Sequence, residues 1–233
     1  MQLFYCQNIN SDRYILSQDE SRHCVKSLRL GEGDEIFLTD GMGKLYRALI
    51  DEPDPKKCTC TITSQAEAEP ALSPKIHMAV ALTKNMNRFE WFLEKATEIG
   101  VSEITPLICR KSERDVANMS RLQGILISAI KQSQRVWLPK LNNPERFTSF
   151  LGENNGYRGY IAWMGEGVGQ QLKDGCSKGE DTIILIGPEG DFTQEEVHQS
   201  VDSGFVPVLL GQYRLRTETA ALVALQTFHF INQ

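Results

Sequence analysis

The chain has 233 residues, 41% of them hydrophobic and 24% charged, with a formal net charge of −5 at pH 7. This composition is typical of a soluble globular protein with one large or two smaller domains, and it excludes a largely disordered chain. The negative charge argues against indiscriminate nucleic-acid binding, because non-specific affinity comes mainly from neutralising phosphates with Lys and Arg. Any nucleic-acid contact must therefore use local basic patches.

The N-terminal residues 1–14 lack a basic start followed by a long apolar core, and no later segment is long enough to cross a bilayer. We therefore expect a cytoplasmic protein with no membrane contact. Six cysteines are present, and we expect reduced, mostly buried thiols. Cys58 and Cys60 would face the same side of a strand, which suits packing at least as well as metal ligation, so no metal site is expected.

Residues 1–72 alternate short β-like runs with turns, which predicts a small, mainly β domain. The runs are QLFYC, DEIFLTD, LYRALI and CTCTITS, at residues 2–6, 34–40, 45–50 and 58–64. Asp40, Gly41 and Gly43 between the second and third runs predict a hairpin connection.

A short helix is predicted over residues 18–30, with Ser17 as its N-cap and Gly31 at its end. The segment 67–74, EAEPALSP, mixes acidic residues, Ala and Pro without periodicity, so it is the predicted linker. We place the domain boundary near residue 72, with domains at 1–72 and 73–233.

The second part alternates apolar runs with segments of helical periodicity, which predicts an α/β fold with a parallel sheet. The predicted strands are KIHMAVAL, ITPLICR, YRGYIAW, TIILI and FVPVLL, at residues 75–82, 104–110, 157–163, 182–186 and 205–210. The predicted helices cover 87–99, 118–133, 193–203 and 217–231. Thr193, with Glu196 three residues later, predicts a capping box.

Two glycine-containing turns follow the last two predicted strands: IGPEGDF after TIILI, and LLGQYRLRTET after FVPVLL. In parallel sheets, ligands bind at such strand ends. Gly187, Gly190 and Gly211 can adopt backbone angles closed to other residues and let a ligand approach the main chain, while Pro188 stiffens the first turn. A purely structural turn would use the same residues.

The order and spacing of these turns, together with NRFEWFLEKATEIGVSEITPLICRKSER at 87–114, resemble the RsmE family of 16S rRNA uracil-N3 methyltransferases, of the SPOUT class. The resemblance runs the whole length of the chain. It implies a PUA-like β-barrel at 1–72, which helps to place the RNA. For 73–233 it implies a SPOUT domain with a deep C-terminal trefoil knot, through which similar proteins form homodimers.

The resemblance also implies that the knot binds S-adenosylmethionine between the two turns. The implied cofactor-binding residues are Ile186, Gly187, Pro188, Glu189, Gly190, Leu210, Gly211, Leu215, Thr217, Thr219 and Ala220. Uracil N3 must lose a proton on methylation, so a base and a cation are expected. Arg216 is the predicted cation, and Glu218 or Glu189 the predicted base. Alternatively, Thr217 caps the last helix, Glu218 stabilises its positive end, and Arg216 forms a surface ion pair.

Basic residues for contact with 16S rRNA gather in three stretches. They are Arg22, His23, Lys26 and Arg29; Lys84 and Arg88; and Arg110, Lys111, Arg114 and Arg135. Arg22, Lys26 and Arg29 fall on one face at helical spacing, as a solvated face would also do. Lys131 stands where many relatives carry Glu, and Tyr213 where many carry a basic or small polar residue.

Two other functions remain open. Another SPOUT activity, such as ribose 2′-O methylation, would use similar cofactor turns, although those enzymes usually show a GSEG-like turn and an Asn-Val-Ser element, where this chain has GPEG and LRTET. A noncatalytic ribosome-assembly protein would tolerate damaged cofactor turns, which this chain does not show. For the enzyme, we expect a partly assembled small ribosomal subunit as substrate.

Overall fold

The computed structural model describes residues 1–65, 70–152, 157–165 and 167–233, which form two compact units. Unit 1 comprises Met1–Ala71 and Ile127–Leu138, and unit 2 comprises Leu72–Leu126 and Pro139–Gln233. The predicted linker at 67–74 lies partly outside the described residues, and the boundary near residue 72 stays a prediction. Unit 1 also takes in residues that this boundary would assign to the second domain.

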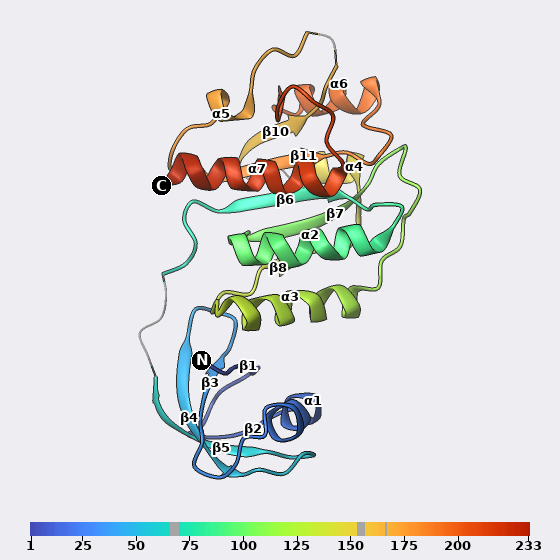
Figure 1. Cartoon of the computed structure of the whole chain (residues 1–233). Helices are drawn as coiled ribbons and strands as arrows, with labels where there is room; N and C mark the ends of the chain where they lie inside the picture. Colours follow the sequence, from blue (N-terminus) through green and yellow to red (C-terminus); the bar gives the residue numbers. More distant parts are fainter. Residues whose placement is uncertain (66–69, 153–156, 166) are drawn as a thin grey trace. The chain divides into compact units, whose positions relative to one another are not determined.

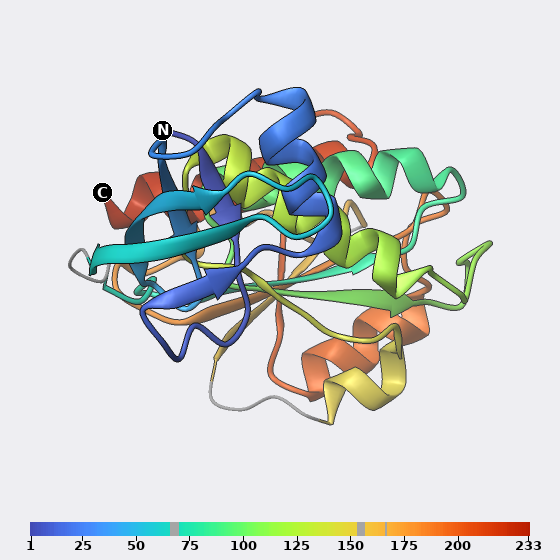
Figure 2. The same cartoon turned by 90° about the horizontal axis from the view of Figure 1, so that it is seen from below.

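Unit 1 is built on a curled sheet of five strands in the order β1-β3-β4-β5-β2 (Figures 1 and 2). The strands are β1 (Leu3–Tyr5), β2 (Arg13–Ile15), β3 (Glu35–Thr39), β4 (Leu45–Glu52) and β5 (Thr59–Gln65). All four predicted strands are confirmed, as is the hairpin turn, where Gly41 and Gly43 have φ of 74° and 92°. The sequence missed β2, because its three residues lack the apolar pattern of a half-buried strand.

The core of unit 1 explains the paired cysteines. Cys58 and Cys60 are both fully buried and pack with Phe4, Ile36 and Leu38. Burial raises the pKa of Cys60 to about 12, which keeps its thiol protonated. The packing interpretation of this pair is therefore confirmed.

The predicted helix over 18–30 is shorter than its pattern indicates. It consists of α1 (Gln18–Arg22) and one π-helical turn, η1 (His23–Ser27), and the Ser17 side chain caps it by accepting a hydrogen bond from Glu20 N. The prediction that Gly31 ends the helix is wrong, because Arg29 already has a left-handed φ of 58°. The π turn and this left-handed residue break the 3.6-residue period, so Arg22, Lys26 and Arg29 do not share a helix face.

Unit 2 is a parallel sheet in the order β12-β10-β11-β6-β7-β8, with β9 also paired to β7. The strands are β6 (Ile76–Ala81), β7 (Glu103–Ile108), β8 (Lys140–Leu141), β9 (Glu145–Arg146), β10 (Arg158–Ala162), β11 (Thr182–Ile186) and β12 (Val206–Val208). The five predicted strands and the α/β class are confirmed. Two-residue strands such as β8 and β9 carry too little pattern to be found from sequence.

Six helices lie in the described residues of unit 2 and across the division between the units, and four of them were predicted from helical periodicity. The six are α2 (Met86–Ile99), α3 (Met119–Ser133), α4 (Phe147–Leu151), α5 (Leu172–Gly175), α6 (Gln194–Asp202) and α7 (Thr217–Asn232). The capping box of Thr193 and Glu196 is present, and Gly100 ends α2 with a φ of 110°. The short helices α4 and α5 were missed, since each spans little more than one turn.

Helices cover both faces of the unit 2 sheet (Figures 1 and 2). On one face α2 and α7 pack side by side, with α7 against β6 and β11. On the other face, Phe147 and Phe150 of α4 and Val197 of α6 join Ala79 and Ala81 of β6 in one core cluster. Burial on both faces explains why β6 and β11 are apolar throughout. Within the described part of the chain, no helix is both long and apolar enough to span a membrane.

Candidate functional site

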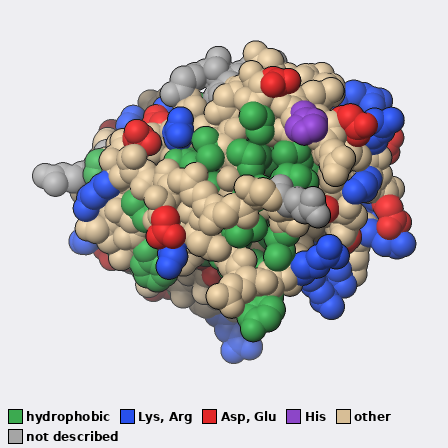
Figure 3. Space-filling view, turned by 90° about the horizontal axis from the view of Figure 1, so that it is seen from above, with side chains coloured by type: hydrophobic (Ala, Val, Ile, Leu, Met, Phe, Trp, Pro, Cys, Tyr) green, Lys and Arg blue, Asp and Glu red, His purple; other side chains and the backbone are tan. Residues whose placement is uncertain are grey.

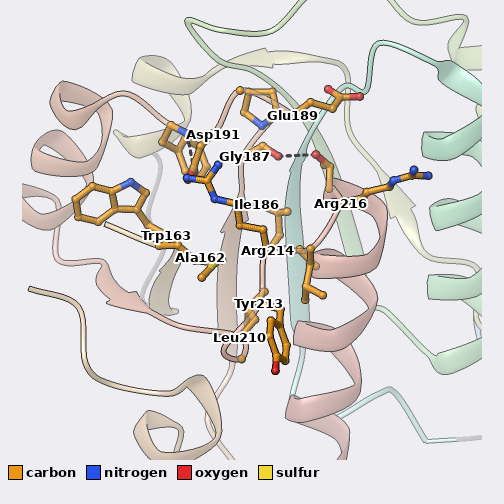
Figure 4. Close-up of a pocket in the computed structure, with 18 of the residues that line it drawn as sticks. Ala162, Trp163, Ile186, Gly187, Glu189, Asp191, Leu210, Tyr213, Arg214 and Arg216 are labelled. Carbon is orange, nitrogen blue, oxygen red and sulfur yellow. Dashed lines mark hydrogen bonds between the residues drawn. The ribbon is translucent and has the colours of Figure 1, made fainter. Parts of the chain in front are cut away.

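A cavity of about 640 Å³ lies at the carboxyl ends of β10, β11 and β12, beside the first turn of α7 (Figure 4). The two glycine-containing turns form much of its wall. Of the predicted cofactor-binding residues, those that line it are Ile186, Gly187, Pro188, Glu189, Gly190, Leu210, Gly211, Leu215, Thr217 and Ala220. Thr219 is exposed on α7 and is not part of this lining. The fold thus brings together two segments separated by some twenty residues.

Thr217 joins the two walls of the cavity. Its side chain is buried, with the residue 4% exposed, and its Oγ1 donates a hydrogen bond of 3.0 Å to the Gly187 carbonyl (Figure 4). The alternative that Thr217 caps α7 is wrong, because Arg216 occupies the N-cap position and its side chain makes no capping bond. The hydroxyl of Thr217 instead fixes the first turn of α7 to the turn after β11.

The three turn glycines serve different needs. Gly211 has a φ of 155°, and a Cβ atom there would meet no protein atom within 4 Å, although the residue lines the cavity. Gly187 and Gly190 do not have positive φ, so the expected conformational role is wrong for them. A Cβ on Gly187 would lie 3.1 Å from the Phe192 ring, and one on Gly190 would lie 3.2 Å from the Lys111 side chain. Gly187 allows close packing of the Phe192 ring and Gly190 allows close approach of the Lys111 side chain, whereas Gly211 leaves the cavity wall open.

Each of the two acids predicted as the base, Glu189 and Glu218, has one carboxylate oxygen in contact with a neighbouring group. Glu189 is exposed, its Oε1 accepts a hydrogen bond from Lys84 N at 3.1 Å, and its carboxylate points away from the cavity (Figure 4). Glu218 is 8% exposed and does not line the cavity. Its Oε1 lies 3.8 Å from Arg88 Nε, and its Oε2 is buried without a hydrogen-bond partner. Arg88, expected to contact RNA, thus forms an ion pair between α2 and α7.

Arg216 lines the cavity next to Thr217, but its guanidinium extends away from Trp163 and Asp191, on the side to which Glu189 also points (Figure 4). The cavity therefore has two sides. The inner side lies between Trp163, Asp191 and Leu210, and the outer side is bordered by the charged groups of Arg216 and Glu189.

Several lining residues were missed from the sequence, namely Lys111, Trp163, Met164, Asp191, Phe192, Val208, Tyr213, Arg214 and, at the end of β10, Ala162. Trp163 follows a predicted strand, so its position at a strand end was the available signal. Asp191 has a left-handed φ of 61°, and its Oδ1 accepts a hydrogen bond of 2.8 Å from Phe192 N. Burial raises the pKa of Asp191, an effect opposed by the Phe192 N–H and by the nearby charges of Lys111 and Arg214.

The basic residues near the cavity have partners among neighbouring groups, and one of them, Lys111, contacts a turn directly. Lys84 Nζ pairs with Glu113 at 2.8 Å, and Arg114 Nε donates to the Lys84 carbonyl at 2.7 Å. Lys111 Nζ donates to two backbone carbonyls of the turn after β11, at 2.8 and 3.3 Å, so it supports that turn. Arg110 is exposed and lies 3.8 Å from Glu195.

The predicted basic residues that lie in unit 1 differ in their exposure to solvent. Those that are exposed are Arg22, His23, Lys26 and Arg29. Arg135 is half-buried, and Lys131 Nζ pairs with Glu20 Oε1 at 2.7 Å, which supplies Lys131 with an acidic partner.

In the face seen in Figure 3, Lys and Arg side chains lie mostly toward the edges, with acidic side chains among them and apolar groups nearer the middle. On this face, the described Lys and Arg side chains form no single basic surface.

No group of three or more His, Cys, Asp or Glu side chains within the described residues is arranged to hold a metal ion. His77 lies outside the cavity: it is buried at the start of β6, and its Nε2 is hydrogen-bonded to Thr105 Oγ1 at 2.8 Å. The cavity therefore presents polar backbone, apolar side chains and a few separated charges.

Comparison with known proteins shows to which family this chain belongs. Residues 70–229 match the family described as RNA methyltransferase domain, and residues 16–63 match the RNA methyltransferase PUA domain. The chain belongs to the RNA methyltransferase family. The resemblance to RsmE enzymes is confirmed, as is the fold: a SPOUT-type parallel sheet with a small PUA-like sheet before it.

Individual relatives agree over nearly their full lengths. A probable rRNA-methyltransferase from Porphyromonas gingivalis is 38% identical, with 100% of this chain and 98% of that chain covered and a TM-score of 0.92. A putative methyltransferase from Legionella pneumophila, solved with the bound cofactor SAM, is 30% identical, with 99% of this chain and 98% of that chain covered and a TM-score of 0.91. The ribosomal RNA small subunit methyltransferase E of Aquifex aeolicus is 29% identical over 95% of this chain and 96% of its own.

Proposed function

We propose that this protein transfers the methyl group of S-adenosylmethionine to N3 of a specific uridine in 16S rRNA of the small ribosomal subunit. The observation that supports this most directly is the cavity itself: both glycine-containing turns of the predicted cofactor site line one space at the carboxyl ends of parallel strands. The SAM-bound relative from L. pneumophila and the rRNA methyltransferase from A. aeolicus support the cofactor and the substrate class.

The residues present fit the cofactor. Gly211 leaves its part of the wall open, so main-chain groups of Leu210 and Leu215 are accessible to an adenine or ribose edge. Ile186 and Leu210 supply apolar surface for a flat ring system. Thr217 keeps the opposing wall at Gly187 in place. When bound, S-adenosylmethionine supplies an activated methyl group, so the protein's main task is to position the acceptor.

The outer side of the cavity offers one group that a uracil needs, the cation Arg216. Loss of the N3 proton leaves negative charge on the neighbouring carbonyl oxygens, and a guanidinium fork can stabilise that charge. We assign this role to Arg216, which is exposed there. We keep Glu218 as the proton acceptor, because its Oε2 has no partner in the described structure and it lies one helical turn or less from Arg216. Contact with substrate then requires that this oxygen become accessible when RNA binds.

The substrate RNA is proposed to contact the basic residues predicted from sequence. Those near the cavity are linked to the turn after β11: Lys84 N donates a hydrogen bond to Glu189 Oε1, and Arg114 Nε donates to the Lys84 carbonyl. A phosphate contact at Lys84 or Arg114 would therefore act next to the cofactor wall, whereas a contact at Arg88 would act on its ion pair with Glu218. The basic residues of unit 1, Arg22, His23, Lys26, Arg29 and Arg135, are proposed to hold RNA through the PUA-like domain.

We further propose a cytoplasmic homodimer whose C-terminal domain contains a trefoil knot. Exposed aromatic side chains on the two adjacent helices support the dimer: Trp91 of α2 is 46% exposed and Phe230 of α7 is 67% exposed. Large exposed aromatic side chains are typical of protein interfaces. Analytical ultracentrifugation of the full chain, compared with a Trp91→Glu, Phe230→Glu double variant, tests this assembly.

The deciding experiment is transfer of labelled methyl from S-adenosylmethionine to unmodified small ribosomal subunits, followed by digestion and mass identification of the nucleoside. N3-methyluridine is the expected product. A 2′-O-methyluridine product would overturn the N3 assignment in favour of ribose methylation, and cofactor binding without any transfer to free or assembled 16S rRNA would favour a noncatalytic RNA-binding protein. Glu218→Gln should abolish transfer while retaining cofactor binding, because Gln cannot accept the N3 proton and Glu218 does not line the cavity; the change also removes the charge that pairs with Arg88.

A further inference from the structure

Most ionisable side chains around the cavity are already engaged or point away from it. Lys111 Nζ donates to two carbonyls of the turn after β11. Glu189 accepts a hydrogen bond from a backbone N–H, and its carboxylate points outward together with the guanidinium of Arg216 (Figure 4). Lys111, Glu189 and Arg216 therefore do not supply a free charged group to the inner side of the cavity.

The remaining charged pair is Asp191 and Arg214, both of which line the cavity. Figure 4 shows the Arg214 guanidinium reaching toward Asp191. Burial raises the pKa of Asp191 and the nearby charge of Arg214 opposes this rise, although no ion pair joins the two among the described residues. Asp191 uses Oδ1 for the Phe192 N–H, which leaves Oδ2 for another donor. Arg214 is exposed and donates no hydrogen bond to any described residue.

Two opposite charges that face one cavity without neutralising each other are complementary to a zwitterion. We propose that Asp191 and Arg214 bind the amino-acid end of the cofactor, with Asp191 accepting from its ammonium group and Arg214 donating to its carboxylate. This assignment rests on the proposed use of S-adenosylmethionine. Charge-assisted hydrogen bonds of both kinds are short and directional, and the planar guanidinium suits a carboxylate.

The backbone at Asp191 supports a functional reason for this side chain. Its left-handed φ of 61° is one that glycine adopts without strain, whereas it is unfavourable for a residue with a Cβ atom, somewhat less so for Asp and Asn. Burial adds a further cost for the charged carboxylate. A ligand ammonium group would offset both costs, since it returns to the carboxylate a partner of opposite charge.

The test uses three probes with different amino-acid ends in calorimetric titrations of the full-length protein. Because decarboxylated S-adenosylmethionine also carries a sulfonium methyl group that S-adenosylhomocysteine lacks, the Kd of each probe is compared between variant and unaltered protein. S-adenosylhomocysteine carries both charges, decarboxylated S-adenosylmethionine lacks the carboxylate, and 5′-methylthioadenosine lacks the whole end. Asp191→Asn is the main variant, because Asn tolerates the left-handed backbone and can still accept from Phe192 N. Arg214→Gln is the second variant, and Asp202→Asn, at an exposed acid at the end of α6, is the matched control.

Asp191→Asn should raise the Kd of S-adenosylhomocysteine and of decarboxylated S-adenosylmethionine by about tenfold to a hundredfold, the range of a hydrogen bond to a charged group, and leave methylthioadenosine binding unchanged. Arg214→Gln should weaken S-adenosylhomocysteine alone. Equal weakening of all three probes, or unchanged S-adenosylhomocysteine binding in Asp191→Asn, would overturn the proposal. If the unaltered protein binds none of the probes and no S-adenosylmethionine, the proposed function itself fails.

Discussion

Replacing Thr217 by Val tests whether the two walls of the cavity act as one unit. Valine keeps the shape of threonine but removes the hydroxyl that donates to the Gly187 carbonyl at 3.0 Å. The residue is only 4% exposed, so water cannot easily replace the lost donor. Loss of one partner from a buried hydrogen bond costs about 1–3 kcal/mol, and we expect the free energy of unfolding to fall by that amount.

Cofactor affinity should fall as well, because the turn at Gly187 would no longer be fixed to the first turn of α7. If about half of the lost energy is needed to restore the bound arrangement of the walls, the Kd for S-adenosylmethionine rises about twofold to tenfold, equivalent to about 0.5–1.4 kcal/mol. Urea unfolding and calorimetric titration measure the two effects separately.

The matched control is Thr227→Val in the same helix. Thr227 Oγ1 donates to the carbonyl of Val223, four residues earlier, at 2.8 Å, so its bond lies within α7 and joins no turns. We expect this variant to change stability by less than about 0.5 kcal/mol and to leave the Kd unchanged. If Thr217→Val and Thr227→Val behave alike in both measurements, the argument that Thr217 couples the walls is wrong.

Three further predictions concern single residues. Gly211→Val should raise the Kd for S-adenosylmethionine more than about a hundredfold, because the valine side chain fills the open wall. The control is Gly204→Val, at a glycine with a φ of 88° beyond α6, which should leave the Kd unchanged. Equal affinities of the two variants in titrations would contradict the prediction. Arg216→Ala should lower kcat about 10²- to 10³-fold with cofactor affinity retained, and an unchanged kcat would exclude Arg216 from catalysis. Burial lowers the pKa of His77 to about 4, so the folded state keeps it neutral while the unfolded chain binds a proton near pH 6.5. Stability should therefore fall by at most roughly 3 kcal/mol as the pH falls from about 6.5 to 4, and His77→Gln should remove this part of the slope in urea unfolding curves recorded across that range.

Local pattern accounts for much of the fold. Apolar runs such as TIILI, bounded by glycine, predicted β11, and the capping box at Thr193 predicted the start of α6. Elements whose sequences carry little periodicity were missed, among them β2 and α5, because their conformations depend on pairing and packing rather than on residue spacing. The helix at residues 18–27 shows the same limit, since its π turn is not encoded in a 3.6-residue pattern.

The sequence by itself determined the α/β class, the two turns and the family resemblance, since each depends on residues close together in the chain. Only the tertiary structure decided how the side chains of those turns are used. Thr217 bonds to Gly187, thirty residues away, and Glu218 pairs with Arg88 on another helix. Asp191 and Arg214 face the same cavity because the carboxyl ends of β11 and β12 lie at one edge of the sheet. Such partnerships depend on distances in space, which the spacing of residues along the chain does not specify.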